Sequence, residues 1–163
     1  MKHVKTVRRI TLSSVVMALY VVVMFATASF AFGQYQVRIA TSLYVLASVY
    51  PWLTVPLGLA NMISNMLMGG LGPYDIVGGL LAGLLTAGCT ALLRKLTDRA
   101  WILVAPVALI PSFVVPIWLS GIVNVPYLAL ALSLLVGQTI SAYTLGIVLL
   151  KINWKKHLPE VGG

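Results

Sequence analysis

The chain has 163 residues, a formal net charge of +8, 60% hydrophobic residues and only 9% charged residues. A water-soluble domain of this size cannot leave long apolar runs without a charged face, whereas a lipid bilayer penalises charge and tolerates apolar surface. The basic residues flank the apolar runs, which is typical of membrane topology signals, so we expect a membrane protein that binds no nucleic acid.

The first apolar run extends from Ile10 to Phe32 and follows four basic residues in the N-terminal tail. A secretory signal peptide is an alternative interpretation, because Ala26, Ala28 and Ala31 resemble the small residues of a cleavage site. The run is longer than the roughly 7–15 apolar residues of a signal peptide. We therefore predict a membrane-spanning helix near residues 10–32.

The second apolar run, from Ile39 to Tyr74, is too long for one ordinary span at about 1.5 Å per helical residue. Pro51 and Pro56 interrupt it, since proline removes a helical hydrogen bond. The pattern predicts two short helices, near residues 38–50 and 54–68.

The remaining sequence predicts three more helices. One lies near residues 75–93 and is closed by Arg94 and Lys95. The uncharged run that follows is long enough for two spans, and Asn124 and Pro126 divide it into helices near 100–121 and 127–150. The predicted fold class is an all-α integral membrane protein, a single domain over residues 1–163 with six transmembrane helices.

The distribution of basic residues predicts the orientation. With six spans and a cytoplasmic N-terminus, every Lys and Arg residue except Arg38 falls in the N-terminal tail, the Arg94–Arg99 connection or the C-terminal tail. These three segments would then share the cytoplasmic side, as the positive-inside rule requires. We therefore expect both termini to be cytoplasmic.

Arg38 is the exception, and two interpretations stay open. Its side chain extends to the outer lipid headgroups, or it faces a cavity where it pairs with an anion, a carbonyl group or Asp75. Asp75 begins the fourth predicted helix, where a carboxylate stabilises free N–H groups and the helix dipole. A capping role and a ligand contact are both compatible with that position.

Several uncharged polar and aromatic residues fall on the same outer half as Arg38 and Asp75. Asn61 and Asn65 share one face of the third predicted helix, at positions i and i+4. Interhelical hydrogen bonding would also explain them, as it would Gln138 in the sixth helix, and an interfacial aromatic belt would explain Trp118. Taken together, these side chains suit a small, planar, polar ligand.

Several kinds of chemistry lack their sequence signatures. The chain has no phosphate-binding loop of the G-x-x-x-x-G-K-[ST] type. No His, Cys or carboxylate cluster has the spacing of a metal site, and no pair of nucleophile and base is evident. We therefore expect a protein that is not an enzyme and has no cofactor or metal.

Two sequence strings resemble the queuosine-precursor transporter (QueT-type) family. The first is Phe32-Gly33-Gln34-Tyr35-Gln36-Val37-Arg38-Ile39, and the second is Gly72-Pro73-Tyr74-Asp75-Ile76-Val77-Gly78-Gly79. Proteins of this family are substrate-binding S-components of energy-coupling factor (ECF) transporters.

The resemblance implies an importer in the plasma membrane of a prokaryote, with an outward-facing pocket for a deazaguanine such as preQ1. It also implies partners, namely a transmembrane coupling protein and two ATPase subunits. The substrate-binding residues that we expect are Gln34, Gln36, Arg38, Asn61, Asn65, Asp75, Trp118 and Gln138.

Ser14 and Ala18 have the small-xxx-small spacing by which the first helix of such subunits meets the coupling protein, although ordinary helix packing would also explain it. The chain departs from the family at Thr41, where an acidic residue is expected. The loss of that carboxylate favours a related base, a nucleoside or another vitamin-like compound as an alternative ligand.

A stand-alone secondary transporter is the main competing function, with Arg38 and Asp75 as its available charged groups. The strong basic asymmetry disfavours a dual-topology exporter, and the missing catalytic cluster disfavours an intramembrane enzyme.

Overall fold

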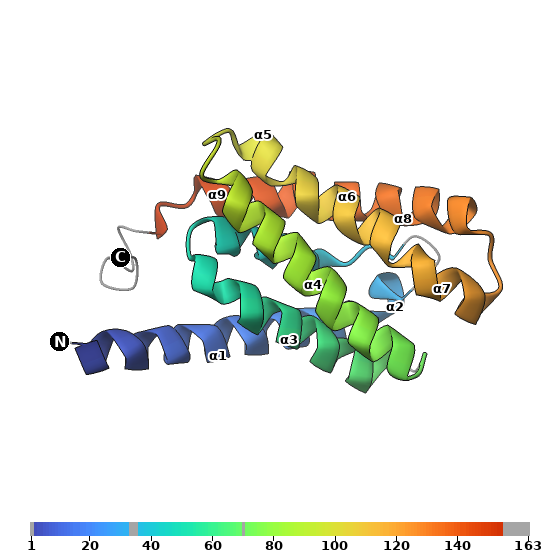
Figure 1. The fold of residues 1–163 in the computed structure, drawn as a ribbon, viewed down its shortest axis with the longest axis horizontal. Helices are drawn as coiled ribbons and strands as arrows, with labels where there is room; N and C mark the ends of the chain where they lie inside the picture. Colours follow the sequence, from blue (N-terminus) through green and yellow to red (C-terminus); the bar gives the residue numbers. More distant parts are fainter. Residues whose placement is uncertain (1, 33–35, 70, 155–163) are drawn as a thin grey trace.

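The computed structural model describes residues 2–32, 36–69 and 71–154, and these residues form helices and their connections without a strand (Figure 1). The predicted all-α class is therefore confirmed for the described chain. In order, the elements are α1 (Lys2–Ala26), α2 (Ala28–Ala31), η1 (Ile39–Ser48), η2 (Pro51–Leu53), α3 (Thr54–Ser64), η3 (Asn65–Gly69), α4 (Pro73–Leu93), α5 (Ala100–Leu103), α6 (Ala105–Val114), α7 (Pro116–Val123), α8 (Tyr127–Ser141), η4 (Ala142–Gly146) and α9 (Ile147–Lys151).

The elements differ from the predicted helices in their regularity. The first helix begins at Lys2 and not near residue 10, and η1 and η2 are 3-10 helices where α-helix was expected. The last turns of the third predicted helix form the π-helix η3, and a second π-helix, η4, interrupts the last one. The predicted segment 100–121 is divided into α5, α6 and α7.

Prolines and one left-handed residue explain the main breaks. Pro73 stands in the first turn of α4, where its missing N–H group costs nothing. The axis bends by 41° between α6 and α7, at Pro116. Asn124 ends α7 in the left-handed region with a φ of 54°, and Pro126 then precedes α8.

Within the described residues, three helices are long and apolar enough to cross a membrane: His3–Ala26, Pro73–Leu93 and Tyr127–Lys151. The bent pair Ala100–Val114 and Pro116–Val123 makes a fourth if it counts as one span. The short helices η1 and α3 do not reach that length. The structure therefore supports three to four spans by length, and the six-span topology remains a proposal.

Large apolar side chains cover the outside of the bundle. Val22 is 62% exposed and Phe25 is 74% exposed on α1, and Ile117 on α7 is 69% exposed. Water would penalise such a surface, whereas lipid tails accept it. The apolar surface of the bundle therefore indicates a membrane protein, as the composition does.

The 3-10 helix η1 is the central element of the bundle. Every residue from Ala40 to Ser48 is buried, and η1 contacts α1, α3, α4, α6, α8, η4 and α9. Hydroxyl groups stabilise its tight turns, since Ser42 and Ser48 donate to the carbonyl oxygens of Ile39 and Val45, each at 2.7 Å. The polar residues of η1 thus face the interior of the bundle, where a soluble protein would have apolar residues.

Helices α3 and α4 pack closely because glycines face each other at their crossing. A Cβ atom on Gly83 would lie 2.9 Å from the Cα atom of Gly58 and 3.0 Å from the hydroxyl of Tyr44. Tyr44 in turn shares a hydrogen bond of 3.2 Å with the hydroxyl of Tyr20 on α1. The contact between Gly58 and Gly83 therefore sets the spacing of α3 and α4, and Tyr44 connects this crossing to α1.

We predict that Gly83→Ala destabilises the protein by about 1–3 kcal/mol, because the added methyl group would push the α3 backbone away. The measurement is the thermal unfolding midpoint of the purified protein in detergent. Gly88→Ala on the same helix is the matched control, since its methyl group would meet only Thr54 Cγ2, at 3.7 Å. An unchanged midpoint for Gly83→Ala would contradict the close packing described here.

Candidate ligand-binding site

Arg38 is buried directly before η1, with 5% of its surface exposed. Its Nε atom donates a hydrogen bond to the carbonyl oxygen of Ala31 at 3.3 Å, and Nη1 donates to the Oδ1 atoms of Asn61 and Asn65 at 3.3 and 3.2 Å. The Phe32 ring lies over the guanidinium, 4.9 Å from Cζ to the ring centroid. The burial and these contacts are inconsistent with a side chain that extends to lipid headgroups.

Asn61 and Asn65 connect Arg38 to the beginning of α4. Each accepts a hydrogen bond from Arg38 through its oxygen and donates one through its amide nitrogen. Asn61 Nδ2 donates to the carbonyl oxygen of Gly79 at 2.8 Å, and Asn65 Nδ2 donates to the backbone carbonyl oxygen of Asp75 at 3.0 Å. The i, i+4 spacing places both amides on the face that meets α4, and the pattern of donors and acceptors fixes how each amide is turned.

Two adjacent glycines on α4 make room for this arrangement. A Cβ atom on Gly79 would lie 2.6 Å from Asn65 Nδ2, and a Cβ atom on Gly78 would overlap the indole ring of Trp118. Any side chain at these two positions would displace the polar groups that surround Asp75. The Gly78-Gly79 pair is therefore part of the architecture of the site.

Asp75 is 1% exposed and is the third residue of α4. Its Oδ1 atom accepts a hydrogen bond from Trp118 Nε1 at 3.1 Å, while its Oδ2 atom is buried without a hydrogen-bond partner among the described residues. The side chain caps none of the backbone N–H groups of α4, although the positive end of the helix dipole stabilises its charge. A buried acceptor without a partner is rare in folded proteins.

Arg38 and Asp75 are not an ion pair. Between residues 2 and 154, apart from the gaps in the description, the ion pair in the structure joins Arg94 to Asp98 at the opposite end of α4. Asn65 separates the two buried charges, since it binds the guanidinium on one side and the backbone of Asp75 on the other. The expected carbonyl partner of Arg38 is present, and the expected carboxylate partner is not.

A second polar group extends the network toward α8. Thr41 Oγ1 lies 2.6 Å from the carbonyl oxygen of Arg38 and 2.9 Å from Gln138 Oε1. Gln138 Nε2 donates a weak hydrogen bond of 3.5 Å to the carbonyl oxygen of Gln36. Gln36 has a φ of 40°, a left-handed conformation that is uncommon outside glycine. Gln138 thus helps to hold the chain that leads into η1.

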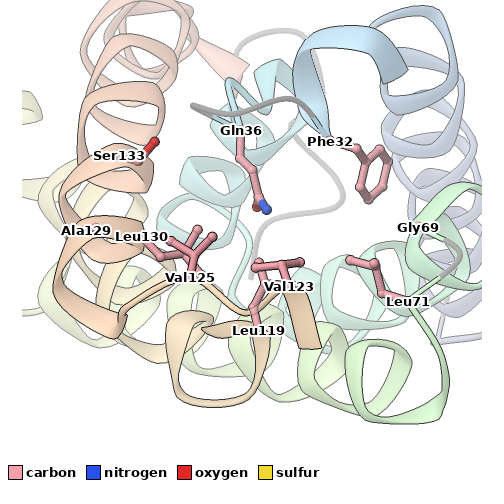
Figure 2. Close-up of a pocket in the computed structure, with 10 residues that line it drawn as sticks. All are labelled: Phe32, Gln36, Gly69, Leu71, Leu119, Val123, Val125, Ala129, Leu130 and Ser133. Carbon is pink, nitrogen blue, oxygen red and sulfur yellow. The ribbon is translucent and has the colours of Figure 1, made fainter. Parts of the chain in front are cut away.

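A cavity of about 400 Å³ lies beside this network, lined by Phe32, which directly follows α2, and by residues of η3, α7, α8 and the connections between them (Figure 2). Phe32 and Gly69 stand on one side, Leu130 and Ser133 stand on the other, and the Gln36 side chain points into the space between them (Figure 2). The volume is within the range of small-molecule sites, and the lining is mostly apolar with a few polar groups, as in such sites.

A smaller cavity, of about 10 Å³, lies among the buried polar groups and has room for about one water molecule. Gln36 lines both cavities, so it stands between the larger space and the buried polar groups. The lining residues of the smaller cavity are Gln36, Arg38, Thr41, Tyr44, Asn61, Ala82, Pro111, Val115 and Gln138.

The structure brings most of the predicted site residues together. Arg38, Asn61, Asn65 and Asp75 form one hydrogen-bonded set, with Trp118 attached through Asp75. Gln36 and Gln138 lie beside that set at the smaller cavity. Gln34 lies outside the described residues. The ligand role of these residues remains a prediction.

Phe32 and Tyr44 belong to the same region but were not predicted as site residues. Phe32 covers Arg38 and lines the larger cavity, and Tyr44 lines the smaller one. An aromatic residue in an apolar run carries no signal of its own, because such residues are common in membrane helices. Only the position of Phe32 next to the Gly33–Arg38 string could have indicated it.

The predicted partner surface on α1 is exposed in the described chain. Ser14 and Ala18 are exposed, and Ser14 Oγ donates only to the carbonyl oxygen of Ile10 in its own helix, at 3.0 Å. Val16 and Tyr20 make up the buried face of α1 instead. Packing within the described part of the chain therefore does not account for the small residues at positions 14 and 18.

The described residues contain no group of three or more His, Cys, Asp and Glu side chains that could hold a metal ion. Cys89 is exposed on α4, away from the polar network. The arrangement offers hydrogen-bond donors, acceptors and two separated charges, which is chemistry suited to recognition.

The model of the QueT transporter family matches residues 10–155 of the chain. That match covers both strings around Arg38 and Asp75, α1 from residue 10 onward with its small residues, and the other helices through α9. No curated protein and no solved structure matches the chain. On the strength of a family match over most of its length, the chain belongs to the QueT transporter family.

Proposed function

We propose that this chain is the substrate-binding S-component of an ATP-driven ECF importer in the plasma membrane of a prokaryote. Its ligand is a queuosine precursor, a deazaguanine such as 7-aminomethyl-7-deazaguanine (preQ1), or a related small polar heterocycle. The partners are a transmembrane coupling protein and two ATPase subunits. The family match and the buried Arg38–Asn61–Asn65 set beside a ligand-sized cavity support this proposal.

The Arg38 set is the single observation that carries the proposal. A buried guanidinium with a fixed orientation is a costly feature in a membrane bundle, and such groups usually serve binding or transport. The set combines fixed amide groups with a charge, which would orient the edge of a planar heterocycle while the apolar cavity wall receives its ring.

We predict that Arg38→Ala weakens binding of 7-aminomethyl-7-deazaguanine to the purified chain by about 30-fold or more, because it leaves buried polar partners unpaired. Isothermal titration calorimetry measures the affinity. Arg94→Ala is the matched control, since Arg94 pairs with Asp98 at the surface and should not affect binding. Equal affinities for the Arg38→Ala variant and the unmodified chain would remove Arg38 from the site.

The six-helix topology with cytoplasmic termini is part of the proposal. The beginning of α1, the α4–α5 connection and the end of α9 lie at one end of the bundle, and the α7–α8 connection lies at the other (Figure 1). The basic residues of the described chain gather in the first group of segments, with Arg38 as the exception. The short elements η1 and α3 would each cross only part of the bilayer, and neighbouring helices would cover them there.

We predict that Thr97→Cys, in a Cys89→Ala background, reacts with a membrane-impermeant thiol reagent only after cells are permeabilised. Position 97 lies in the α4–α5 connection, which the proposal places inside. Val125→Cys, in the exposed α7–α8 connection, should react in intact cells and serves as the matched control. Labelling of position 97 from outside would refute the orientation.

The proposal also assigns a partner to the exposed small residues of α1. Small side chains let a second helix approach closely, and Ser14 and Ala18 are one turn apart on a face that is exposed in the described chain. A helix of the coupling protein is the occupant that the family match favours.

We predict that replacing both Ser14 and Ala18 by Leu abolishes co-purification with the coupling protein and ATPases while ligand affinity stays within about twofold, because the larger side chains would hold the partner helix away. Val15→Ala on the same helix controls for changes in exposed surface. Recovery of the intact complex with the double variant would show that the dock lies elsewhere. Uptake that persists without the ATPases and follows a proton gradient would indicate a secondary transporter instead.

A further inference from the structure

We propose that the end of the bundle where α4 and α9 finish holds the phosphate headgroup of an anionic phospholipid, between Arg94 and Lys151. The proposed function gives this place no role, and it lies at the other end of α4 from Asp75. The site requires only that α4 and the helix ending at Lys151 cross the membrane, so it does not depend on the transported ligand.

The site is a surface pocket of about 290 Å³. Arg94, the C-cap of α4, and Lys151, in the last turn of α9, both line the pocket, and both are exposed. Val49 and Leu150 supply an apolar part of its wall. A pocket that joins two accessible bases to apolar side chains matches a phosphate headgroup and the acyl chains attached to it.

The ends of two spans give the depth of this pocket in the bilayer. The span Pro73–Leu93 ends one residue before Arg94, and the span Tyr127–Lys151 ends at Lys151 itself. The two ends lie at the same end of the bundle (Figure 1). The apolar core of a bilayer stops where its spanning helices become charged, and the phosphate groups of the lipids begin there. Arg94 and Lys151 are therefore at the level of the headgroups, whichever leaflet this end faces.

Aromatic residues hold one wall of the pocket in place. Trp154 lines the pocket, and its Nε1 atom donates a hydrogen bond to the carbonyl oxygen of Leu149 at 2.7 Å. The hydroxyl of Tyr50 donates to the carbonyl oxygen of Trp154 at 3.3 Å. Tryptophan is enriched where the bilayer meets water, beside the headgroups. Trp154 therefore indicates the same depth as the span ends, and its contacts preorganise the pocket.

The charges of the pocket favour an anion. Arg94 Nη2 lies 3.2 Å from Asp98 Oδ1, but a guanidinium has several N–H donors, so one carboxylate does not saturate it. The C-terminal ends of α4 and α9 carry partial negative charge, and one base at each end would stabilise them. That role explains each base separately, but not the pocket that the two share with Trp154. A phosphate between Arg94 and Lys151 would use both positive charges.

A segment of the chain is the competing occupant. Residues 155–163 follow Trp154 directly and lie outside the described residues. Glu160 is the carboxylate side chain of that segment, so it is the group that would compete with a phosphate for the two bases. A variant at this position therefore belongs in the test.

Native mass spectrometry of the delipidated full chain in detergent measures which phospholipids bind. Phosphatidylglycerol should bind about 10-fold or more tightly than zwitterionic phosphatidylcholine. The double variant Arg94→Ala, Lys151→Ala should lose this preference. The double variant Lys95→Ala, Arg99→Ala is the matched control, because it removes the same charge from exposed residues that do not line the pocket, and it should keep the preference.

Equal losses in the two double variants, or no preference in the unmodified chain, would overturn the headgroup site. Displacement of phosphatidylglycerol by inorganic phosphate would show a site for a free anion and not for a lipid. Tighter binding of phosphatidylglycerol by Glu160→Gln than by the unmodified chain would assign the pocket to the C-terminal segment. Each of these results would leave the proposed function in place, because none concerns the site around Arg38.

Discussion

The burial of one guanidinium group among the helices is the constraint on which the rest of the structure depends. An arginine inside a membrane bundle must find acceptors within the protein, because lipid provides none. Arg38 finds them in a backbone carbonyl and in the side chains of Asn61 and Asn65, with Phe32 as a cover. Each acceptor comes from a different turn of the chain, so α2, α3 and η3 must all meet at the start of η1.

Close helix packing follows from that constraint. The Asn61 and Asn65 amides reach the backbone of α4 only because Gly79 and Gly83 let the two helices approach. The tight 3-10 turns of η1 bring Thr41 toward Gln138, which joins α8 to the same polar group. A ligand that binds at the adjoining cavity would therefore contact elements from both halves of the chain. Binding energy at such a place can change how the two halves pack, which is what a transport subunit requires.

The sequence predicted an all-α membrane protein correctly, because charge distribution and hydropathy report directly on the solvent of a membrane protein, whereas its six spans and their orientation stay predictions. It also placed Arg38, Asn61 and Asp75 in one site, since isolated polar groups in apolar runs are conspicuous. It could not predict that η1 is a 3-10 helix, because tertiary packing against the surrounding helices decides that conformation. It also could not predict that one carboxylate oxygen of Asp75 has no hydrogen-bond partner among the described residues, since that depends on which donors reach the carboxylate.

The most direct test of this account is an experimental structure of the chain purified with 7-aminomethyl-7-deazaguanine. The account predicts ligand density in the cavity between Phe32 and Leu130, with the ring edge at the Arg38 set. Density at another place, such as the surface groove beside Tyr74 and Leu81 or the opposite end of the bundle near Lys151, would contradict it.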